Sequence, residues 1–528
     1  MEDINLNWRH YIIILIAFAV VLTAGINHGI WRPDEPYMAG ICSEMARTHN
    51  FAVPTLNGNP FLEKPPLYYA VAAVSGIVFG TDNDVSFRIV SILFSVMTLL
   101  AVFLVMRRRK DTTTALLSVL VLATMWEFFR ISRWILVDIS LVFGVTLSML
   151  SWLVLSEGKK VKRYALLFGL GVAVSFMAKG FVGPAIIAAG VAADILRRRD
   201  FRLIYKCRPD IMLVFMLIPV ALWIAVLWSK GGWPFVREVI VVNNLMRFTG
   251  TKEAAALGHQ HNILYYFQGF PGTLVPWTLI FIPALIASIK RFRDNPYISW
   301  LIGPFIILSI ASTKRDLYLA PLLPACAIMI AEWLQTAQKA KWEDIIMKFM
   351  WVLVLIASVV PFAGIFLGVP LLGAVMGTIS VVLLILIEKD KTIRRTSLAF
   401  ALSLAIALGS LMSVYYKYWQ PHEDYIPLTR QALALAGNNQ IRMIADDEIF
   451  EGIIPMLTGK NIENVDSAEH IRITGYYIWS DDKHDSTLKQ LQKLNNFKLL
   501  YDKPIGHNKK VRLAYITPSI NTAGPAAR

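Results

Sequence analysis

The sequence has 528 residues, of which 56% are hydrophobic and only 17% are charged, and its mean hydropathy is +0.53. Soluble domains average roughly 45–50% apolar and about 25% charged residues, so this composition excludes an ordinary soluble protein and predicts a membrane protein. The formal net charge of +15 comes from short basic clusters between apolar runs, which is typical of cytoplasmic loops and argues against a nucleic-acid-binding protein.

Apolar runs of membrane-spanning length follow one another through the first 415 residues. A helix needs roughly 20 apolar residues to cross a bilayer. The sequence does not show a small-residue cleavage site after the first run, so we expect an uncleaved span there. Two shorter stretches, 39–46 and 67–80, are expected to lie in the membrane interface. The thirteen expected spans cover approximately 11–30, 85–105, 112–130, 134–155, 164–179, 181–196, 211–229, 269–289, 297–313, 316–335, 349–367, 370–387 and 396–415.

Basic clusters occur in every second loop of this arrangement. Residues 107–110, 159–163 and 197–199 belong to such loops, whereas the alternate loops carry scattered single charges. Because loops rich in lysine and arginine stay in the cytoplasm, we expect a cytoplasmic N-terminus in the inner (plasma) membrane. An odd number of spans then places the chain beyond residue 415 in the periplasm.

The C-terminal part, 416–528, has a different pattern. Short or alternating apolar stretches occur at 441–445, 471–479, 497–501 and 511–516, and 486–494 has helical spacing. We therefore expect an α-helical polytopic domain over 1–415 and a small periplasmic α/β domain over 416–528. Two long periplasmic loops are expected at about 31–84 and 230–268.

Polar residues collect on the expected periplasmic side, at the outer ends of many spans. Together they predict one outward-facing polar cavity. The candidate residues are Asp34, Glu35, Tyr37, Glu63, Lys64, Arg133, Asp138, Lys179, Arg247, His259, Lys314 and Tyr318.

The carboxylates of this set admit two interpretations each. Asp34 and Glu35 stand between prolines, and they are either a solvated loop or carboxylates placed for general-base chemistry. Asp138 begins a span, where an unpaired charge is expensive. It either pairs with Arg130 or Arg133 or has a functional role.

The cations also have a structural alternative. Lys64 either forms a surface ion pair with Glu63 or, held by the two prolines after it, points toward a phosphate. Lys179 either extends toward the membrane surface or joins Lys64, Arg247 and Lys314 in an anion site. The sequence does not require a cofactor. His259 and Glu63 are candidate ligands of a divalent metal, zinc or magnesium, although loop histidines more often have no metal.

The order of these motifs resembles the GT-C-fold membrane glycosyltransferases, in the branch that contains the lipid A aminoarabinose transferase and the protein O-mannosyltransferase-like enzymes. The resemblance runs through nearly the whole chain. Its pieces are Asp34-Glu35, Asn57-Gly58, Glu63-Lys64-Pro65-Pro66-Leu67-Tyr68-Tyr69, Arg133 with Asp138, Ala178-Lys179-Gly180, Asn243 with Arg247-Phe248-Thr249-Gly250, His259 with Tyr265-Tyr266, Pro276-Trp277, and Lys314 with Tyr318, Pro321 and Pro324.

The resemblance implies a sugar donor linked to polyprenyl (undecaprenyl) phosphate and transfer with inversion on the periplasmic side. It implies that Asp34 is the catalytic carboxylate, that Lys64 and Tyr318 hold the lipid phosphate, and that Glu63 and His259 can take a metal. The family motif often reads Asp-Glu-x-Arg-Tyr-Ala, whereas this chain has Tyr37 in the arginine position.

The acceptor remains open between a lipid A-like lipid, a glycan and a protein hydroxyl. A transporter of a lipid or an anion is the main alternative from another functional class. Transporters place their charged residues near the bilayer midplane. The candidate residues here lie at the outer ends of the spans, so the sequence favours the transferase.

Overall fold

The computed structural model describes residues 8–246, 261–335, 340–390, 396–445, 447–482, 484–506 and 509–518. The chain divides into two compact units. The helical unit contains 1–26, 62–68 and 89–415, and the mixed unit contains 27–61, 69–88 and 416–528.

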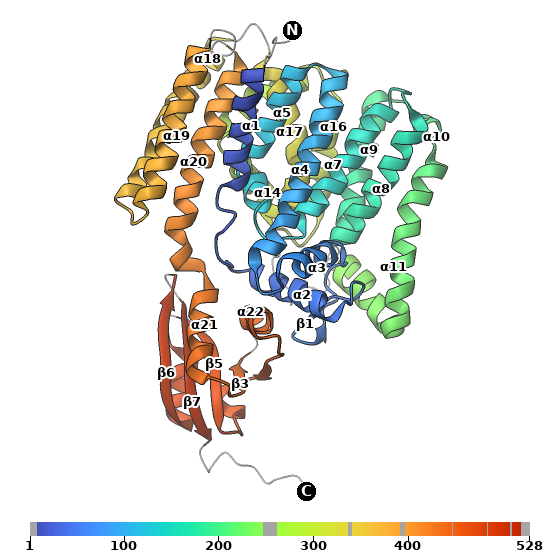
Figure 1. The fold of residues 1–528 in the computed structure, drawn as a ribbon. Helices are drawn as coiled ribbons and strands as arrows, with labels where there is room; N and C mark the ends of the chain where they lie inside the picture. Colours follow the sequence, from blue (N-terminus) through green and yellow to red (C-terminus); the bar gives the residue numbers. More distant parts are fainter. Residues whose placement is uncertain are drawn as a thin grey trace. The chain divides into compact units, whose positions relative to one another are not determined.

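The helical unit is a bundle of membrane-type helices (Figure 1). Helix α4 begins in the mixed unit, and α20 ends in it. Three segments, η1, η2 and η3, are π or 3-10 turns that continue neighbouring helices. The elements are α1 (Trp8–Thr23), α4 (Asp84–Arg109), α5 (Thr112–Thr124), α6 (Trp126–Ile131), α7 (Asp138–Leu155), α8 (Val161–Lys179), α9 (Val182–Arg198), α10 (Leu203–Lys206), α11 (Pro209–Arg237), η1 (Glu238–Met246), α14 (Tyr265–Thr273), α15 (Thr278–Lys290), α16 (Tyr297–Ile310), η2 (Asp316–Leu322), α17 (Leu323–Leu334), α18 (Lys341–Val359), η3 (Val360–Ile365), α19 (Pro370–Lys389) and α20 (Ser397–Glu423).

The described residues contain eight helices that are long and apolar enough to cross a membrane, or nine if the bent pair α14 and α15 is one span. Each of the thirteen expected segments holds helix, but α1, α5, α9 and α16 are shorter than the bilayer requires by this measure. The chain is therefore a multi-pass membrane protein, and the count of thirteen crossings stays a prediction.

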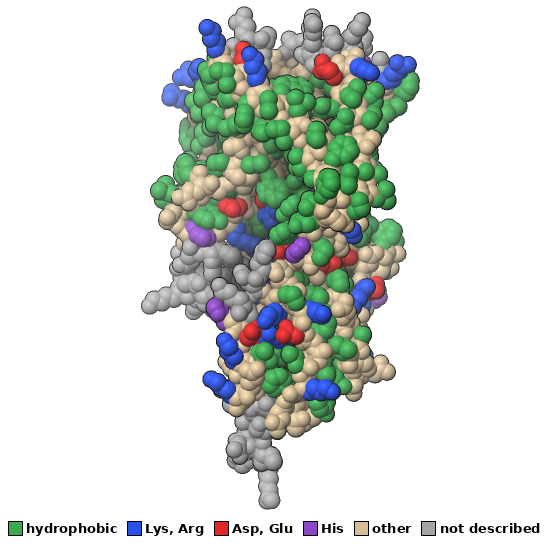
Figure 2. Space-filling view, turned by 90° about the vertical axis from the view of Figure 1, so that its left-hand side faces the viewer, with side chains coloured by type: hydrophobic (Ala, Val, Ile, Leu, Met, Phe, Trp, Pro, Cys, Tyr) green, Lys and Arg blue, Asp and Glu red, His purple; other side chains and the backbone are tan. Residues whose placement is uncertain are grey.

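Burial separates central helices from peripheral ones. The apolar window of α7 is 94% buried, whereas that of α11 with η1 is only 17% buried. Figure 2 shows hydrophobic side chains over the flank of the bundle and lysines and arginines gathered at one end. An apolar flank bounded by basic residues is what a lipid bilayer requires of the surface that it covers.

The mixed unit contains a five-stranded sheet in the order β4-β3-β5-β7-β6 (Figure 1). Strand β3 pairs in parallel with β4 and β5, and the other pairs are antiparallel. The four expected strands and the expected helix at 486–494 are present, and α21, α22 and β4 were not predicted. The elements are α2 (Glu35–Thr48), β1 (Thr55–Leu56), β2 (Asn59–Pro60), α3 (Leu67–Phe79), α21 (Tyr425–Ala436), β3 (Ile441–Ile444), α22 (Glu448–Thr458), β4 (Glu463–Val465), η4 (Ala468–His470), β5 (Gly475–Asp482), α23 (Ser486–Leu494), β6 (Asn495–Ile505) and β7 (Lys509–Pro518).

Helix α2 packs closely on α22 within the mixed unit, which links the first long loop to the C-terminal part. A Cβ atom added to Gly40 would come within 2.4 Å of the Gly452 Cα atom, so the two backbones approach as only glycines allow. The Asn57 side chain also accepts from the backbone N–H of Ile462 and donates to its carbonyl, both at 2.8 Å. These contacts fix α2, whose first turn carries the candidate carboxylates.

Candidate active site

A cavity of about 520 Å³ lies within the helical unit. One part of its wall is polar and comes from the 62–68 segment, the end of α8, η1 and η2. The other part is apolar and comes from α9 and α16. The lining residues are Glu63, Lys64, Lys179, Phe181, Val182, Pro184, Ala185, Ile186, Ala188, Asn243, Asn244, Ile307, Leu308, Ala311, Thr313 and Tyr318.

Lys179 is the last residue of α8, and its ammonium forms an ion pair with Asp138 at the start of α7. Both side chains are almost fully buried. The same ammonium lies over the Tyr318 ring, 4.3 Å from its centroid, in a cation–π contact. Three helix ends thus converge on one cation, which brings two of the expected phosphate-binding residues together.

The expected partner of Asp138 was wrong. Asp138 pairs with Lys179, and Arg130 pairs instead with Glu127 at 2.7 Å, three residues before it. Arg133 is buried and donates to the carbonyl of Ala24 at 2.7 Å and to that of Val21. Its guanidinium therefore satisfies carbonyls at the end of α1, which α1 itself leaves without intrahelical partners.

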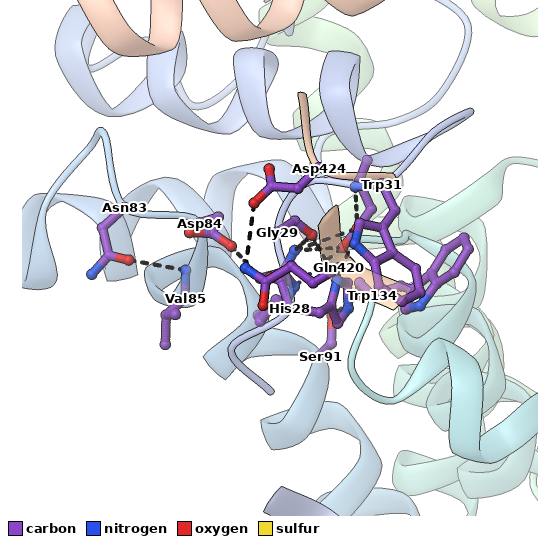
Figure 3. Close-up of polar contacts among 12 residues, drawn as sticks. His28, Gly29, Trp31, Asn83, Asp84, Val85, Ser91, Trp134, Gln420 and Asp424 are labelled. Carbon is purple, nitrogen blue, oxygen red and sulfur yellow. Dashed lines mark hydrogen bonds and ion pairs between the residues drawn. The ribbon is translucent and has the colours of Figure 1, made fainter. Parts of the chain in front are cut away.

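The 62–68 segment presents Glu63 and Lys64 to the cavity and is held at both ends. The Asn243 amide donates to the Leu62 carbonyl at 3.3 Å. The Tyr68 hydroxyl bonds Ser91 at 2.7 Å. Ser91 in turn donates to the Trp134 carbonyl at 2.6 Å (Figure 3). The backbone on both sides of Lys64 is therefore held in place before any ligand binds, and the position of the Lys64 ammonium group does not depend on an unanchored loop.

Lys314 is buried but does not line the cavity. Its ammonium donates to the carbonyl of His261 at 3.0 Å and to that of Ala311. Burial lowers the pKa of Lys314. In this arrangement the lysine ties together the two chain segments that precede α14 and η2.

Arg247 and His259 lie outside the described residues, so the structure gives no geometry for them. Among the residues that it does describe, no group of three or more His, Cys, Asp or Glu side chains is arranged to hold a metal ion. Glu63 lines the cavity as a single carboxylate.

In the mixed unit, Asp34 is the N-cap of α2, and Pro36 occupies its first turn. The side chain of Asp34 is 7% exposed and accepts a hydrogen bond from the Tyr37 hydroxyl at 3.2 Å. The residue that replaces the family's usual arginine therefore orients the candidate catalytic carboxylate. The sequence offered no sign of this contact beyond the three-residue spacing on one helix face.

Glu35 is fully buried and accepts from several donors. The Arg88 guanidinium lies 3.1–3.3 Å from its two oxygens, and the Trp31 backbone N–H donates at 3.0 Å. Arg88 also donates to the carbonyl of Gly29 at 2.8 Å and forms an ion pair with Asp84. Arg88 has no local sequence signal for this role, because its partner Glu35 lies 53 residues away.

Figure 3 shows His28, Gly29, Trp31, Gln420 and Asp424 of the mixed unit. A Cβ atom at Gly29 would come within 1.8–2.3 Å of the Asp424 carboxyl, so Asp424 fills the space that glycine leaves open. The Gln420 amide donates to Asp424 at 3.4 Å. Residues 28–31, in the turn before α2, are therefore buried.

Comparison with known families and relatives gives consistent results. Residues 12–232 match the family described as dolichyl-phosphate-mannose-protein mannosyltransferase. The undecaprenyl phosphate-alpha-4-amino-4-deoxy-L-arabinose arabinosyl transferase of Serratia proteamaculans is 27% identical over 63% of this chain and 60% of its own length. The undecaprenyl phosphate-alpha-4-amino-4-deoxy-L-arabinose arabinosyl transferase 2 of Proteus mirabilis is 26% identical over 62% of this chain and 61% of its own length. The chain thus spans less than two thirds of these two relatives.

Among solved structures, the chain is similar to the crystal structure of ArnT from Cupriavidus metallidurans bound to undecaprenyl phosphate. The TM-score is 0.75 with 17% identity, and the match covers 98% of this chain and 99% of that one. The apo structure of the same protein also gives a TM-score of 0.75, with 16% identity and 98% of both chains covered. At this level of identity the comparison shows a shared fold.

Proposed function

We propose that this chain is a GT-C-fold glycosyltransferase that uses polyprenyl-phosphate-linked sugars, and that it transfers a monosaccharide from undecaprenyl phosphate to a lipid A-like or glycan acceptor. Transfer takes place on the periplasmic side of the inner membrane and inverts the anomeric carbon. The family match and the arabinosyl transferase relatives support a glycosyltransferase over the transporter alternative.

The amphipathic cavity of the helical unit carries this proposal. Its polar wall offers the ammonium groups of Lys64 and Lys179 and the hydroxyl of Tyr318. Its apolar wall is formed by α9 and α16, with Val182, Ile186 and Leu308 among the lining residues. A lipid phosphate has the same two parts, an anionic head and a hydrocarbon chain. A water-soluble nucleotide sugar would not need the apolar wall.

In the proposed reaction, the cations of the polar wall stabilise the charge that develops on the phosphate as it leaves. Preplaced charges in a poorly hydrated site act more strongly than the same charges in water. Asp138 holds the Lys179 ammonium in place and partly offsets its charge, while Lys64 supplies a second cation. Arg247 is proposed as a third phosphate ligand on the resemblance alone.

Asp34 is proposed to accept the proton of the acceptor nucleophile. The new bond from the acceptor to the anomeric carbon forms as the bond from that carbon to the phosphate oxygen breaks, so undecaprenyl phosphate leaves and the configuration inverts. Tyr37 orients the Asp34 carboxylate by its hydrogen bond. Glu35 is saturated by Arg88 and Trp31, so we propose that it anchors the turn and does not react.

A metal has no assigned step in this mechanism. The resemblance implies a site at Glu63 and His259, and the described residues contain no group of three or more His, Cys, Asp or Glu side chains that could hold a metal ion. Lys314 and Arg133 are proposed as positioning residues, since backbone carbonyls occupy their charged groups.

The proposal is tested by incubating the purified protein with membrane lipid extract and following donor and acceptor masses. Wild type is expected to consume an undecaprenyl-phosphate sugar while one acceptor gains the mass of that sugar. Asp34→Asn is expected to abolish this transfer, because an amide does not accept the proton, and to keep donor binding. Turnover by Asp34→Asn at the wild-type rate would remove Asp34 from the mechanism.

The cavity is tested in the same preparation by undecaprenyl-phosphate binding. Lys64→Ala is expected to weaken binding at least about tenfold, since hydrogen bonds to charged groups contribute about 1.5–3 kcal/mol. Lys159→Ala is the matched control, because the Lys159 side chain is 72% exposed and does not line the cavity. Equal affinities of wild type and Lys64→Ala would contradict the assigned phosphate site.

A protein hydroxyl is the second candidate acceptor. The match of residues 12–232 to the protein mannosyltransferase family favours it. The same mass measurement separates the two acceptors, because the sugar mass appears either on a lipid or on a protein.

A further inference from the structure

A second groove, of about 250 Å³, is lined by residues of α4, α7 and α8 and shares no lining residue with the cavity described above. Its apolar wall includes Leu100 and Leu104 of α4 and Phe143 and Leu147 of α7. Leu100 is 52% exposed and Leu104 is 43% exposed, so the groove opens on the apolar flank of the bundle. In a membrane, the hydrocarbon chains of lipids cover this flank.

Two arginines line the same groove, Arg108 near the end of α4 and Arg163 near the start of α8. Both side chains are exposed. Both belong to the basic clusters that mark the expected cytoplasmic end of the bundle. The groove is therefore apolar along α4 and α7 and positively charged where Arg108 and Arg163 line it.

Several other basic residues at this end pair with carboxylates. Arg109 pairs with Glu157, Lys110 pairs with Glu332 at 2.9 Å, and Arg198 pairs with Asp194 at 2.8 Å. Within the described part of the chain, Arg108 and Arg163 have neither an ion pair nor a hydrogen bond from their side chains. Two guanidinium groups without carboxylate partners, beside one apolar groove, are complementary to an anion that carries a hydrocarbon chain.

We propose that this groove binds an anionic phospholipid of the cytoplasmic leaflet, with its phosphodiester between Arg108 and Arg163 and an acyl chain along Leu100 and Leu104. Basic pockets between transmembrane helices bind acidic lipid head groups in this way. Arginine suits the role because its planar donors match phosphate oxygens. The site is independent of the proposed transferase reaction, since it shares no lining residue with the donor cavity.

The test is native mass spectrometry of the full-length protein in a neutral detergent, titrated with dioleoyl phosphatidylglycerol. Wild type is expected to retain one phosphatidylglycerol at concentrations where phosphatidylcholine is not retained. Arg108→Gln with Arg163→Gln is expected to weaken retention about 25-fold, from roughly fivefold for each guanidinium. Leu104→Trp, which fills the groove without changing its charge, is expected to weaken retention as well.

The matched control is Arg107→Gln with Lys162→Gln, which removes two charges from the neighbouring positions of the same helices. Both side chains are exposed and neither lines the groove. An equal loss in the control would overturn the proposal in favour of diffuse surface attraction. Equal retention of phosphatidylcholine, tighter groove-dependent retention of undecaprenyl phosphate, or competition by inorganic phosphate alone would also overturn it.

Discussion

At the residue scale, the structure divides charged side chains into those that present their charge to a cavity and those that use it within the protein. Lys64 and Lys179 line the donor cavity, whereas Lys314 and Arg133 donate to backbone carbonyls. Burying a charge without a partner is costly, so each interior cation has a definite acceptor. The chemical type of a residue at a helix end therefore does not by itself define its role.

Tyr37 provides a prediction at this scale. Tyr37→Phe removes the hydrogen bond to Asp34, which is 3.2 Å long. We expect the turnover rate to fall about 2- to 13-fold, because a hydrogen bond contributes a net 0.5–1.5 kcal/mol. Donor affinity is expected to stay unchanged. The measurement is a comparison of turnover with undecaprenyl-phosphate binding; a loss of affinity at unchanged turnover would show that Tyr37 holds the phosphate instead.

At the element scale, single side chains join secondary structures that are far apart in the sequence. Glu35 links α2 to the start of α4 through Arg88, and Asp138 links α7 to α8 through Lys179. In the sheet, Asp481 of β5 accepts from the backbone N–H groups of Thr487 and Leu488 near the start of α23. It also pairs with Arg512 of β7 at 2.7 Å.

Asp481 gives a pH prediction. Burial alone would raise the pKa of Asp481, but the donors from Leu488, Thr487, Trp479 and Arg512 outweigh burial and lower that pKa below 3.8. The carboxylate therefore stabilises the mixed unit above pH 3.8, and this contribution is lost as the pH falls through the lower folded-state pKa.

The measurement is proteolysis of the mixed unit in the intact protein between neutral and acid pH. Asp481→Asn is expected to be less stable than wild type near neutral pH, with a difference that shrinks as the pH falls below 3.8. Asp466→Asn is the control, since its side chain is 86% exposed. A difference that does not change with pH would contradict the assigned role of the ionised carboxylate.

At the scale of the whole molecule, the alternation of basic loops determines which side of the membrane each end should occupy. Thirteen spans with a cytoplasmic N-terminus would place the sheet of the mixed unit in the periplasm. The three native cysteines are buried, so introduced cysteines can report sidedness with little background.

Sidedness is predicted to be visible with a thiol reagent that does not cross the inner membrane. Lys460→Cys in the mixed unit is expected to react in cells whose outer membrane has been made permeable. Lys159→Cys, at an exposed lysine in an expected cytoplasmic loop, is expected to react only after lysis. The reversed pattern would mean that the count of spans or the orientation is wrong.

The sequence by itself determined the membrane class, the helical segments and most strands of the sheet, because these depend on local composition and on periods that a short window contains. The order of the motifs was also sufficient to indicate the glycosyltransferase family. Helices α21 and α22 were missed although both are amphipathic, since they are only 12 and 11 residues long.

Only the tertiary structure decided which charged groups are partners. Asp138 pairs with Lys179 and not with a nearby arginine, and Glu35 pairs with Arg88. The tertiary structure also turned Lys314 toward backbone carbonyls and placed Lys64 at the cavity. These pairings depend on how closely distant segments approach and on which buried polar groups need a hydrogen-bond partner. A local sequence pattern contains neither kind of information.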